Sequence, residues 1–153
     1  MLPYQHMDST VEWHCIAAHP TRDLIFVSTG QWNREHLQIV QAFNSHGTQL
    51  FHIGESGYHP GQFREIRGLA IDTRRDLLLV ADGGNHRIQA FHLNGIFEHQ
   101  WATSPIPTAI SYNDDTIFIG GPGTIETFTF CRKSKKRKLD HWIFLLPTTP
   151  KVE

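Results

Sequence analysis

The sequence predicts an all-β fold built from about three stacked, four-stranded antiparallel units. The first observation is internal repetition, because the segment 68–91 is echoed once upstream and once downstream at a spacing of about forty residues. The second is the pattern inside each copy, where short apolar blocks rich in Val, Ile, Phe and Leu are separated by Gly, Asn and Asp. The third is that no stretch keeps a long helical periodicity, apart from a weak one at 35–42.

The first copy lies near 13–54 and carries a longer loop than the central copy. Its matches keep a constant shift up to Gly30 and resume after the loop that contains "QWNREH". The matched pairs include Asp23 with Asp76, Val27 with Val80, Val40 with Ile88, and Phe43 with Phe91. Gaps confined to one loop are typical of true structural repeats.

The central copy lies near 67–102 and gives the clearest strand pattern. We predict strands at 68–72, 77–82, 87–91 and 97–101, which together make one antiparallel sheet. The second of these is apolar at every position from 77 to 80, so we expect it to be buried between neighbouring sheets. The third alternates between polar and apolar residues.

The third copy lies near 107–131 and needs one shortened loop to align. Its matches to Asp76, Val80, Ile88 and Phe91 are Asp115, Ile119, Ile125 and Phe128. We therefore divide the chain into a lead-in at 1–12, a repeat region at 13–131, and a basic, then apolar, C-terminal tail at 132–153. Two alternatives stay open for the apolar run 142–146, which either supplies a closing strand or belongs to an unrelated tail.

Five short motifs follow one another through the central copy. They are "GQF" at 61–63, "GLAID" at 68–72, "LLLVAD" at 77–82, "NHRIQAF" at 85–91 and "NGIF" at 94–97. With these motifs in this order, the central copy closely resembles the NHL repeat, whose copies form the blades of β-propellers. The first copy departs from the pattern, with Ser28 and Thr29 in place of Ala81 and Asp82, and the third departs further with Gly120–Gly123.

The resemblance implies a partial β-propeller of about three NHL-type blades. Closed propellers need at least about four blades, so three blades leave apolar faces and strand edges uncovered. We expect the chain to be part of a longer propeller, ahead of an arrangement in which two copies self-associate into a ring of six blades.

An acid, an amide and a cation lie close together near the end of a predicted strand, at Asp82, Asn85 and Arg87. Such side chains satisfy backbone groups in turns, and an arginine pairs readily with a carboxylate of its own or an adjacent blade. We therefore predict a structural role rather than a catalytic one. The residues predicted to hold the repeat together are Gly68, Asp72, Asp82, Asn85, Arg87, Phe91 and Gly95.

The family's topology implies a binding face. In a propeller, the loops that join the second strand to the third, and the last strand to the next blade, emerge on one common face. Aromatic residues beside arginine suit both protein interfaces and stacking on unpaired bases. The residues predicted to bind a partner there are Trp32, Asn33, Arg34, His36, Tyr58, Arg64, Arg67, Asn85 and His86.

Charge is unevenly distributed along the chain. Residues 1–131 hold seven Arg against thirteen Asp and Glu, which leaves a formal charge of −6, whereas the run 132–138 holds six of the 14 Lys and Arg. This run has two interpretations, a nuclear localisation signal or a solvated tail. The residues of the possible signal are Arg132, Lys133, Lys135, Lys136, Arg137 and Lys138.

The sequence offers no set of metal ligands, and we predict neither a cofactor nor a catalytic residue. The eleven histidines are scattered, and the two cysteines, Cys15 and Cys131, form no metal-binding spacing. No apolar run is long enough to span a bilayer and no signal peptide is visible, so we expect an intracellular protein, cytoplasmic or nuclear, without a membrane segment.

Three functions from different classes follow from the resemblance. The first is a non-catalytic scaffold for protein–protein interaction, with substrate recognition in a ubiquitin-ligase system as its finer form; the RING domain of such a ligase would have to lie elsewhere. The second is binding of single-stranded RNA, which the acidic body disfavours because phosphate contacts supply much of nucleic-acid affinity. The third is a metal-dependent propeller lyase or hydrolase, for which no catalytic constellation is present.

Overall fold

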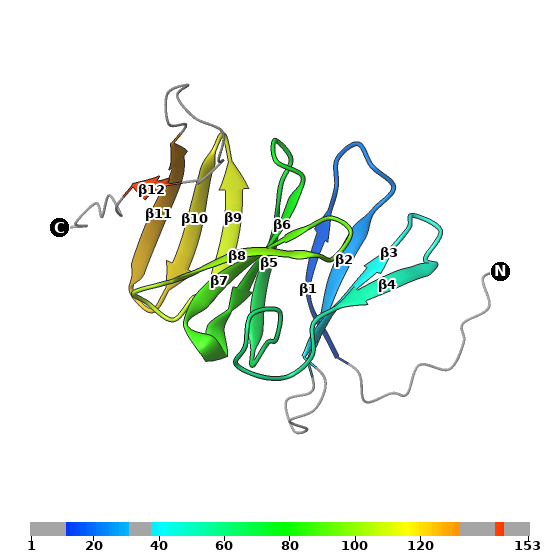
Figure 1. Cartoon of the computed structure of the whole chain (residues 1–153), viewed down its shortest axis with the longest axis horizontal. Coiled ribbons are helices and arrows are strands. Elements are labelled where there is room, and N and C mark those ends of the chain that lie inside the picture. The colour runs from blue at the N-terminus through cyan, green and yellow to red at the C-terminus, as the bar shows by residue number, and fades with distance from the viewer. Residues whose placement is uncertain (1–11, 31–37, 132–142, 146–153) are drawn as a thin grey trace.

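The computed structural model describes residues 12–30, 38–131 and 143–145, which form three four-stranded antiparallel sheets (Figure 1). We call each sheet a blade. The first blade contains β1 (Glu12–Ala18), β2 (Ile25–Gly30), β3 (Ile39–Phe43) and β4 (Gln49–Ile53). The second contains β5 (Ile66–Asp72), β6 (Leu77–Asp82), β7 (Arg87–His92) and β8 (Phe97–Ala102), with the short 3-10 helix η1 (Gly83–Asn85) between β6 and β7. The third contains β9 (Ala109–Asn113), β10 (Thr116–Gly121), β11 (Thr124–Cys131) and β12 (Ile143–Leu145).

The three blades are arranged as neighbouring sheets of a propeller. In each blade the strands pair in chain order, and the first strands β1, β5 and β9 lie next to one another (Figure 1). The all-β prediction with about three four-stranded blades is confirmed. The four strands predicted in the central copy agree with β5 to β8 to within two residues at every boundary.

The third blade differs from the prediction, which ended it at 131 and assigned 132–153 to a tail. Ile143–Leu145 instead pair with Thr129–Cys131 as a fourth antiparallel strand. The physical reason is that β11 would otherwise leave a row of unpaired backbone groups, and the short apolar stretch has a high β-propensity. Of the two alternatives for 142–146, the structure has the closing strand. The basic run 132–138 lies outside the described residues, as do most of the lead-in 1–12 and the end of the tail.

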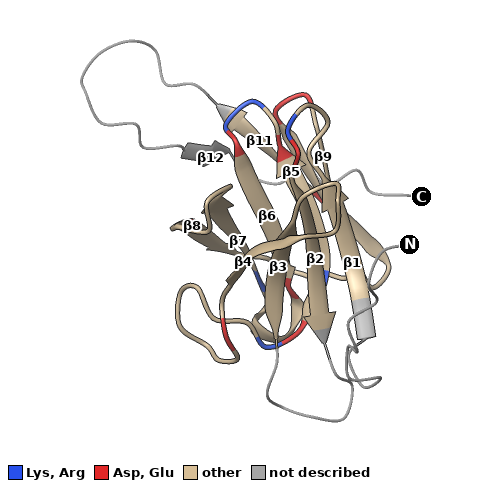
Figure 2. Cartoon of the chain, turned by 90° about the vertical axis from the view of Figure 1, so that its right-hand side faces the viewer, with Lys and Arg blue, Asp and Glu red and all other residues tan. Residues whose placement is uncertain are grey.

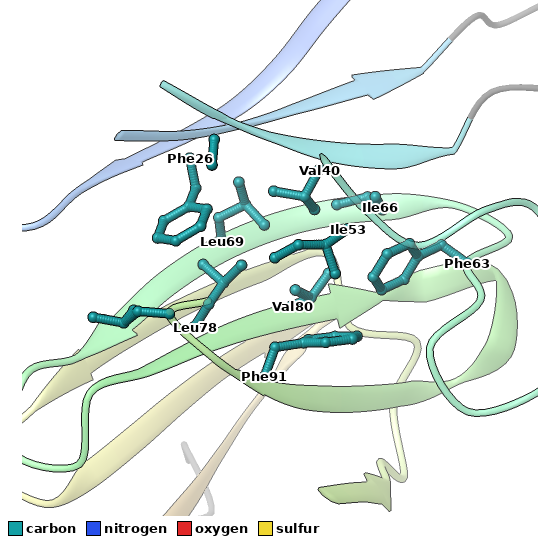
Figure 3. Close-up of a cluster of buried hydrophobic side chains, with 11 residues drawn as sticks. Phe26, Val40, Ile53, Phe63, Ile66, Leu69, Leu78, Val80 and Phe91 are labelled. Atoms are coloured by element: carbon teal, nitrogen blue, oxygen red, sulfur yellow. The ribbon is translucent and has the colours of Figure 1, made fainter. Parts of the chain in front are cut away.

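The first interface between blades is a cluster of buried apolar side chains (Figure 3). The first blade contributes Phe26 and Val40, and the second blade contributes Leu78, Val80 and Phe91, none more than 1% exposed. Such burial is the main favourable contribution to folding. The alternation along each strand explains the arrangement, because every second residue of a strand points to the same face.

A second cluster fills the interface between the second and third blades. Leu79 and Ile88 of the second blade pack there with Ile117 and Ile119 of the third, and all four are 0% exposed. Residues 77–82 of β6 are therefore buried throughout, with one set of side chains in each interface. This confirms the prediction that the apolar run 77–80 is covered on both faces.

Two of the predicted repeat-structural residues are glycines with different local requirements. At Gly68 a Cβ atom would lie 2.9 Å from a methyl carbon of Ile110, so the close approach of β5 to β9 leaves no room for a side chain. Gly95 has φ +92° in the turn between β7 and β8, where its N–H donates to the carbonyl of His92. This backbone conformation favours glycine.

The blades have two ends with different connections (Figure 1). We call one the turn end; it carries the β1–β2, β5–β6 and β9–β10 turns. We call the other the loop end; it carries the β4–β5 connection and the β6–β7 connection with η1. Figure 2 shows that charged residues gather at these two ends, while most of the strand surface is uncharged.

Candidate functional site

The site that stands out at the loop end is built on the connection between β4 and β5, residues 54–65, which we call the clamped loop. Its backbone folds back on itself through hydrogen bonds from Gly57 N to Phe63 O at 2.8 Å and from Phe63 N to Glu55 O at 2.7 Å. The side chain of Phe63 is 0% exposed and lies in the first interface cluster (Figure 3). The loop is therefore fixed at its C-terminal part by an apolar anchor.

Arg87 of β7 holds the other part of the clamped loop. A guanidinium group has five N–H donors, and the structure gives each of them an acceptor within hydrogen-bonding distance. The acceptors are Asp82 Oδ2 at 2.9 Å from Nε, Tyr58 O at 2.8 Å and Gln100 Oε1 at 2.9 Å from Nη1, and His59 O at 2.9 Å and Gln62 O at 2.8 Å from Nη2. Since Arg87 is only 7% exposed, this arrangement is a buried clamp on three loop carbonyls.

Asp82 and Gln89 complete the clamp, and both are 0% exposed. Asp82 Oδ1 accepts a hydrogen bond from Arg64 N at 3.0 Å, while its Oδ2 accepts from Arg87 and, at 3.1 Å, from Gln89 Nε2. Gln89 also accepts from Gly61 N and donates to Gln62 O, each at 2.8 Å. A buried polar network that is satisfied in this way rigidifies the segment that it holds.

Asn85 belongs to the same network rather than to an open surface. Its Nδ2 donates to Gly57 O at 2.9 Å and to Asp82 Oδ2 at 2.8 Å, and the residue is half-buried. Asn85 was predicted both as a repeat-structural residue and as a partner-binding residue, and its amide nitrogen has both of these contacts within the chain. The next residue, His86, is exposed with φ +53° and ends η1.

The exposed part of the site lies on the outside of the clamped loop. Tyr58 is 67% exposed, and the guanidinium carbon of Arg64 lies 5.3 Å from the centre of the Tyr58 ring. Arg67 Nη2 pairs with Glu65 Oε1 at 2.7 Å. The arrangement of Arg64 over Tyr58 is a cation–π contact at a surface that is open to solvent.

The structure thus places five of the nine predicted partner-binding residues near one another at the loop end. Contacts join the parts of this group: Arg64 N donates to Asp82, and Gly83 N donates to the carbonyl of Glu65 at 2.7 Å, which brings η1 beside the loop. The other four, Trp32, Asn33, Arg34 and His36, lie outside the described residues. We name the exposed side chains of Tyr58, Arg64, Arg67 and His86 the loop-end surface.

Sequence reasoning missed Gln89 and Phe63 as residues of this site. A signal was present, because Arg87 and Gln89 are the polar members of an alternating strand, and alternation usually means that one face meets water. Here that face meets the clamped loop, so its polar side chains are buried and bonded to the loop backbone.

Among the described residues, the carboxylate–arginine pair of the clamp is found in the second blade. The register puts Thr29 and Ile39 of the first blade at the positions of Asp82 and Arg87. Strand register shows which residues of the three blades are equivalent. Gln89 pairs with Val80 in the second blade, and the corresponding pairs are Gln41 with Val27 in the first blade and Glu126 with Ile119 in the third. In the third blade Gly121 and Thr124 stand at the positions of Asp82 and Arg87, because the pairs Gly121–Thr124 and Asp82–Arg87 both close the hairpin. The third blade therefore has a buried carboxylate, Glu126, at the position of Gln89, and it has no arginine at the position of Arg87.

Glu126→Gln is expected to raise the free energy of unfolding by about 1 kcal/mol. Glu126 is 5% exposed, and its Oε2 has no hydrogen-bond partner among the residues that the structure describes, so this buried carboxyl group is poorly satisfied. An unpaired amide is less costly to bury than an unpaired carboxylate. Urea unfolding at pH 7 measures the change.

The matched control is Glu98→Gln, because Glu98 is exposed and pairs with the ring nitrogen Nε2 of His92 at 2.8 Å. Loss of such a surface pair changes stability by no more than about 0.5 kcal/mol. A lower stability of Glu126→Gln than of the unchanged chain would show that the Glu126 carboxylate has a donor in solution.

A shallow groove lies where the first strands of the three blades meet. It has a volume of about 280 Å³ and is lined mainly by apolar residues of β1, β5 and β9, among them Ile16, Leu69, Ala70 and Ile110. Within residues 12–30, 38–131 and 143–145, no group of three or more His, Cys, Asp or Glu is placed to hold a metal ion. The described strands and turns also include no helix with the length and apolar character to cross a bilayer.

Comparison with known proteins agrees with the fold and with the central copy. The model of the NHL repeat matches residues 63–91. The chain is 46% identical over 49 residues to protein brain tumor of Drosophila melanogaster, which is 32% of this chain and 5% of that protein. It is 46% identical over 48 residues to the B-box type zinc finger protein ncl-1 of Caenorhabditis elegans, which is 31% of this chain and 6% of that protein.

Solved structures with the same arrangement of blades have little sequence in common with this chain. A structure in the nidogen/laminin complex superposes with a TM-score of 0.62 at 16% identity, over 80% of this chain and 44% of that one. The WD40 repeats of RRP9 superpose with a TM-score of 0.63 at 11% identity, over 80% of this chain and 37% of that one. WD40 repeats form β-propellers, so these likenesses establish the fold. Residues 63–91 match the NHL repeat, and the chain folds as three blades of a β-propeller.

Proposed function

We propose that the chain is a non-catalytic interaction scaffold and that its loop-end surface binds a segment of another protein. The observation that carries the proposal is the exposure of Tyr58 and Arg64 on a loop whose backbone is held by the buried clamp of Arg87. Ordering a flexible loop costs free energy during binding, and a loop that is already fixed avoids that cost. Tyrosine and arginine are also the residue types that dominate protein interfaces.

The charges of the loop-end surface indicate the chemistry of the partner. Arg67 is paired with Glu65, whereas the guanidinium of Arg64 lies over an aromatic ring and has no carboxylate partner among the described residues. A carboxylate from a partner therefore finds an available cation next to an aromatic surface. This supports a short acidic segment with an apolar or aromatic side chain as the ligand.

Tyr58→Ala and Arg64→Ala are each expected to weaken binding of such a segment by about tenfold or more, because each removes one half of the stacked pair. Panning of a random peptide library on the intact chain supplies the ligand, and calorimetry measures its affinity for each variant. Unfolding should change little, since both side chains are exposed. Tyr58→Phe and Arg64→Lys are the matched controls, and we expect Tyr58→Phe to keep most of the affinity.

RNA binding is the outcome that would overturn this proposal. Arg64 stacked on Tyr58 resembles a platform for an unpaired base, while the formal charge of −6 over residues 1–131 opposes a polyanion. Fluorescence polarisation with single-stranded RNA pools distinguishes the two. RNA affinity that falls steeply with salt and depends on Arg64 and Arg67, with no peptide selected, would favour RNA as the ligand.

Substrate recognition for a ubiquitin ligase is the finer form of the same proposal. It requires a catalytic domain on another part of the protein or on another subunit. Its support is the resemblance of the central copy alone, and a peptide selected on the loop-end surface would identify substrates to test.

A further inference from the structure

The turn end carries a pattern that repeats from blade to blade. In the first blade the β1–β2 turn contains Arg22 followed by Asp23, and in the second blade the β5–β6 turn contains Arg75 followed by Asp76. In both turns the residue three positions before the arginine accepts hydrogen bonds from turn N–H groups. His19 Nδ1 accepts from Arg22 N at 3.1 Å, and Asp72 Oδ1 accepts from Arg75 N at 3.1 Å. The two arginines are therefore equivalent in structure as well as in sequence.

Each arginine reaches the aspartate of the following blade. Arg22 pairs with Asp76, which joins the first blade to the second. Arg75 Nη2 pairs with Asp115 Oδ1 at 2.6 Å, which joins the second blade to the third. The second contact is partly shielded, because Arg75 is also paired with Asp72 and lies over the Phe130 ring at 3.9 Å from its centre. The Arg75 guanidinium holds the pKa of Asp115 below its usual value. We call this series the arginine ladder.

The arginine ladder begins with an aspartate, Asp23, that has no arginine partner among the described residues. Asp23 of the first blade stands where Asp76 and Asp115 accept an arginine, but no arginine of the described residues reaches it. Its carboxylate accepts from the N–H of Ser45, which lowers the pKa of Asp23 and keeps it ionised at neutral pH. An exposed anion in the position of a ladder acceptor is available to a cation from outside the first blade.

A second observation concerns the face of the first blade that points away from the second. Val40 and Ala42 pack into the first interface cluster, so the alternation of β3 puts Gln41 on the opposite face. Gln41 Oε1 is buried and has no hydrogen-bond partner within residues 12–30, 38–131 and 143–145. In the equivalent Gln89 this atom accepts from Gly61 N, which belongs to the loop before its blade. Gln41 therefore has an acceptor atom where a preceding loop would supply a donor.

The other end of the arginine ladder carries the wrong charge for a second copy. In the third blade the residue before Asp115 is Asp114, where the other blades have arginine. The Asp114 side chain is 83% exposed and pairs with Arg74 Nη2 of the neighbouring blade at 3.3 Å, so a second copy would meet a carboxylate that already has a cation partner. If two copies formed a six-blade ring, Asp114 of one would face Asp23 of the other. Like charges opposed across an interface are a common means of rejecting a wrong partner.

We propose that the face of the first blade that bears Asp23 and Gln41 docks a further propeller blade with an arginine at the position of Arg22 and Arg75, and that Asp114 prevents a second copy from occupying it. The partner is defined by chemistry: a four-stranded blade with a basic first turn and a loop that offers a free N–H group. This surface is separate from the loop-end surface, so the two proposals stand or fall independently.

Mixing two variants tests the proposal on the intact chain. One protein, the donor variant, carries Asp114→Arg, which supplies the missing arginine, and Asp23→Lys, which removes the aspartate that would bind that arginine in another donor molecule. The other protein, called the acceptor, is the unchanged chain. Sedimentation velocity should show little association of either alone and an affinity in the mixture about tenfold or more above the self-association of the unchanged chain. Added salt should weaken the mixture, because the pair is close to solvent.

Asp114 has φ +45°, a backbone conformation that arginine adopts less readily than aspartate, so Asp114→Arg could disturb the turn. A second donor variant therefore supplies the arginine in a different turn. In it, residues 114 and 115 are replaced by Thr-Arg-Arg-Asp, the sequence of the β5–β6 turn, and circular dichroism checks the fold of each donor. Asp23→Asn in the acceptor should abolish the gain. Three results would overturn the proposal: stable dimers of the unchanged chain, association that survives Asp23→Asn, or folded donors that gain no affinity for the acceptor.

Discussion

Arg87→Ala is expected to lower the free energy of unfolding by about 3–5 kcal/mol, because it breaks a buried ion pair and leaves one partner charged and buried. The change removes the bond from Arg87 Nε to Asp82 Oδ2, and Asp82 is 0% exposed. It also removes the donors to the carbonyls of Tyr58, His59 and Gln62, three groups of the clamped loop. Guanidinium chloride unfolding, followed by circular dichroism, measures the loss.

Two arginine variants serve as controls for this result. Arg64→Ala removes a guanidinium of the same kind from an exposed site, where the contact with Tyr58 contributes no more than about 1 kcal/mol. Arg87→Lys keeps the charge, but one ammonium with three donors cannot serve five acceptors in a planar arrangement, so most of the loss should persist. Unchanged stability of Arg87→Ala together with lost ligand binding would instead make Arg87 a ligand-binding residue.

The clamp explains why the fold was easier to predict than the site. Strands β5 to β8 follow from repetition and from runs such as 77–80, since burial between two sheets demands apolar residues on both faces. The alternation in 87–91 is ambiguous by itself, because a polar face is needed against water and also against a loop with free backbone groups. Only the tertiary structure shows that Arg87 and Gln89 meet the clamped loop.

The turn end shows a similar limit. The repeat alignment places Asp23, Asp76 and Asp115 at one position, and that much is visible in the sequence. The sequence does not show that each arginine reaches forward to the next blade, because ion pairs between turns depend on how neighbouring sheets are stacked. The structure shows that Arg22 and Arg75 each pair with the aspartate of the next blade. Asp114 stands at the corresponding position of the third blade and carries the opposite charge.

Phe63→Ala is expected to lower the free energy of unfolding by about 3–5 kcal/mol, the range for removing a large aromatic side chain from a core. Phe63 is 0% exposed, and its ring centre lies 5.6 Å from that of Phe91, which in turn lies 5.7 Å from that of Phe97. The residue is the apolar anchor of the clamped loop, so its loss should also release the loop. Hydrogen exchange should speed up at the amides of Gly57 and Gly61, whose acceptors are Phe63 O and Gln89 Oε1.

Two substitutions separate the loss of the anchor from a general effect of losing a phenyl ring. Phe118→Ala removes the same group from β10, where it is 40% exposed, and should cost clearly less than Phe63→Ala. Phe63→Leu keeps an apolar side chain in the cluster and should retain much of the stability and the slow exchange. If Phe63→Ala cost no more than Phe118→Ala, the loop would not be docked through Phe63, and the polar clamp of Arg87 would have to hold it alone. If stability fell but exchange at Gly61 stayed slow, the clamp and the anchor would be separable, and ligand binding at Tyr58 should survive the loss of the anchor.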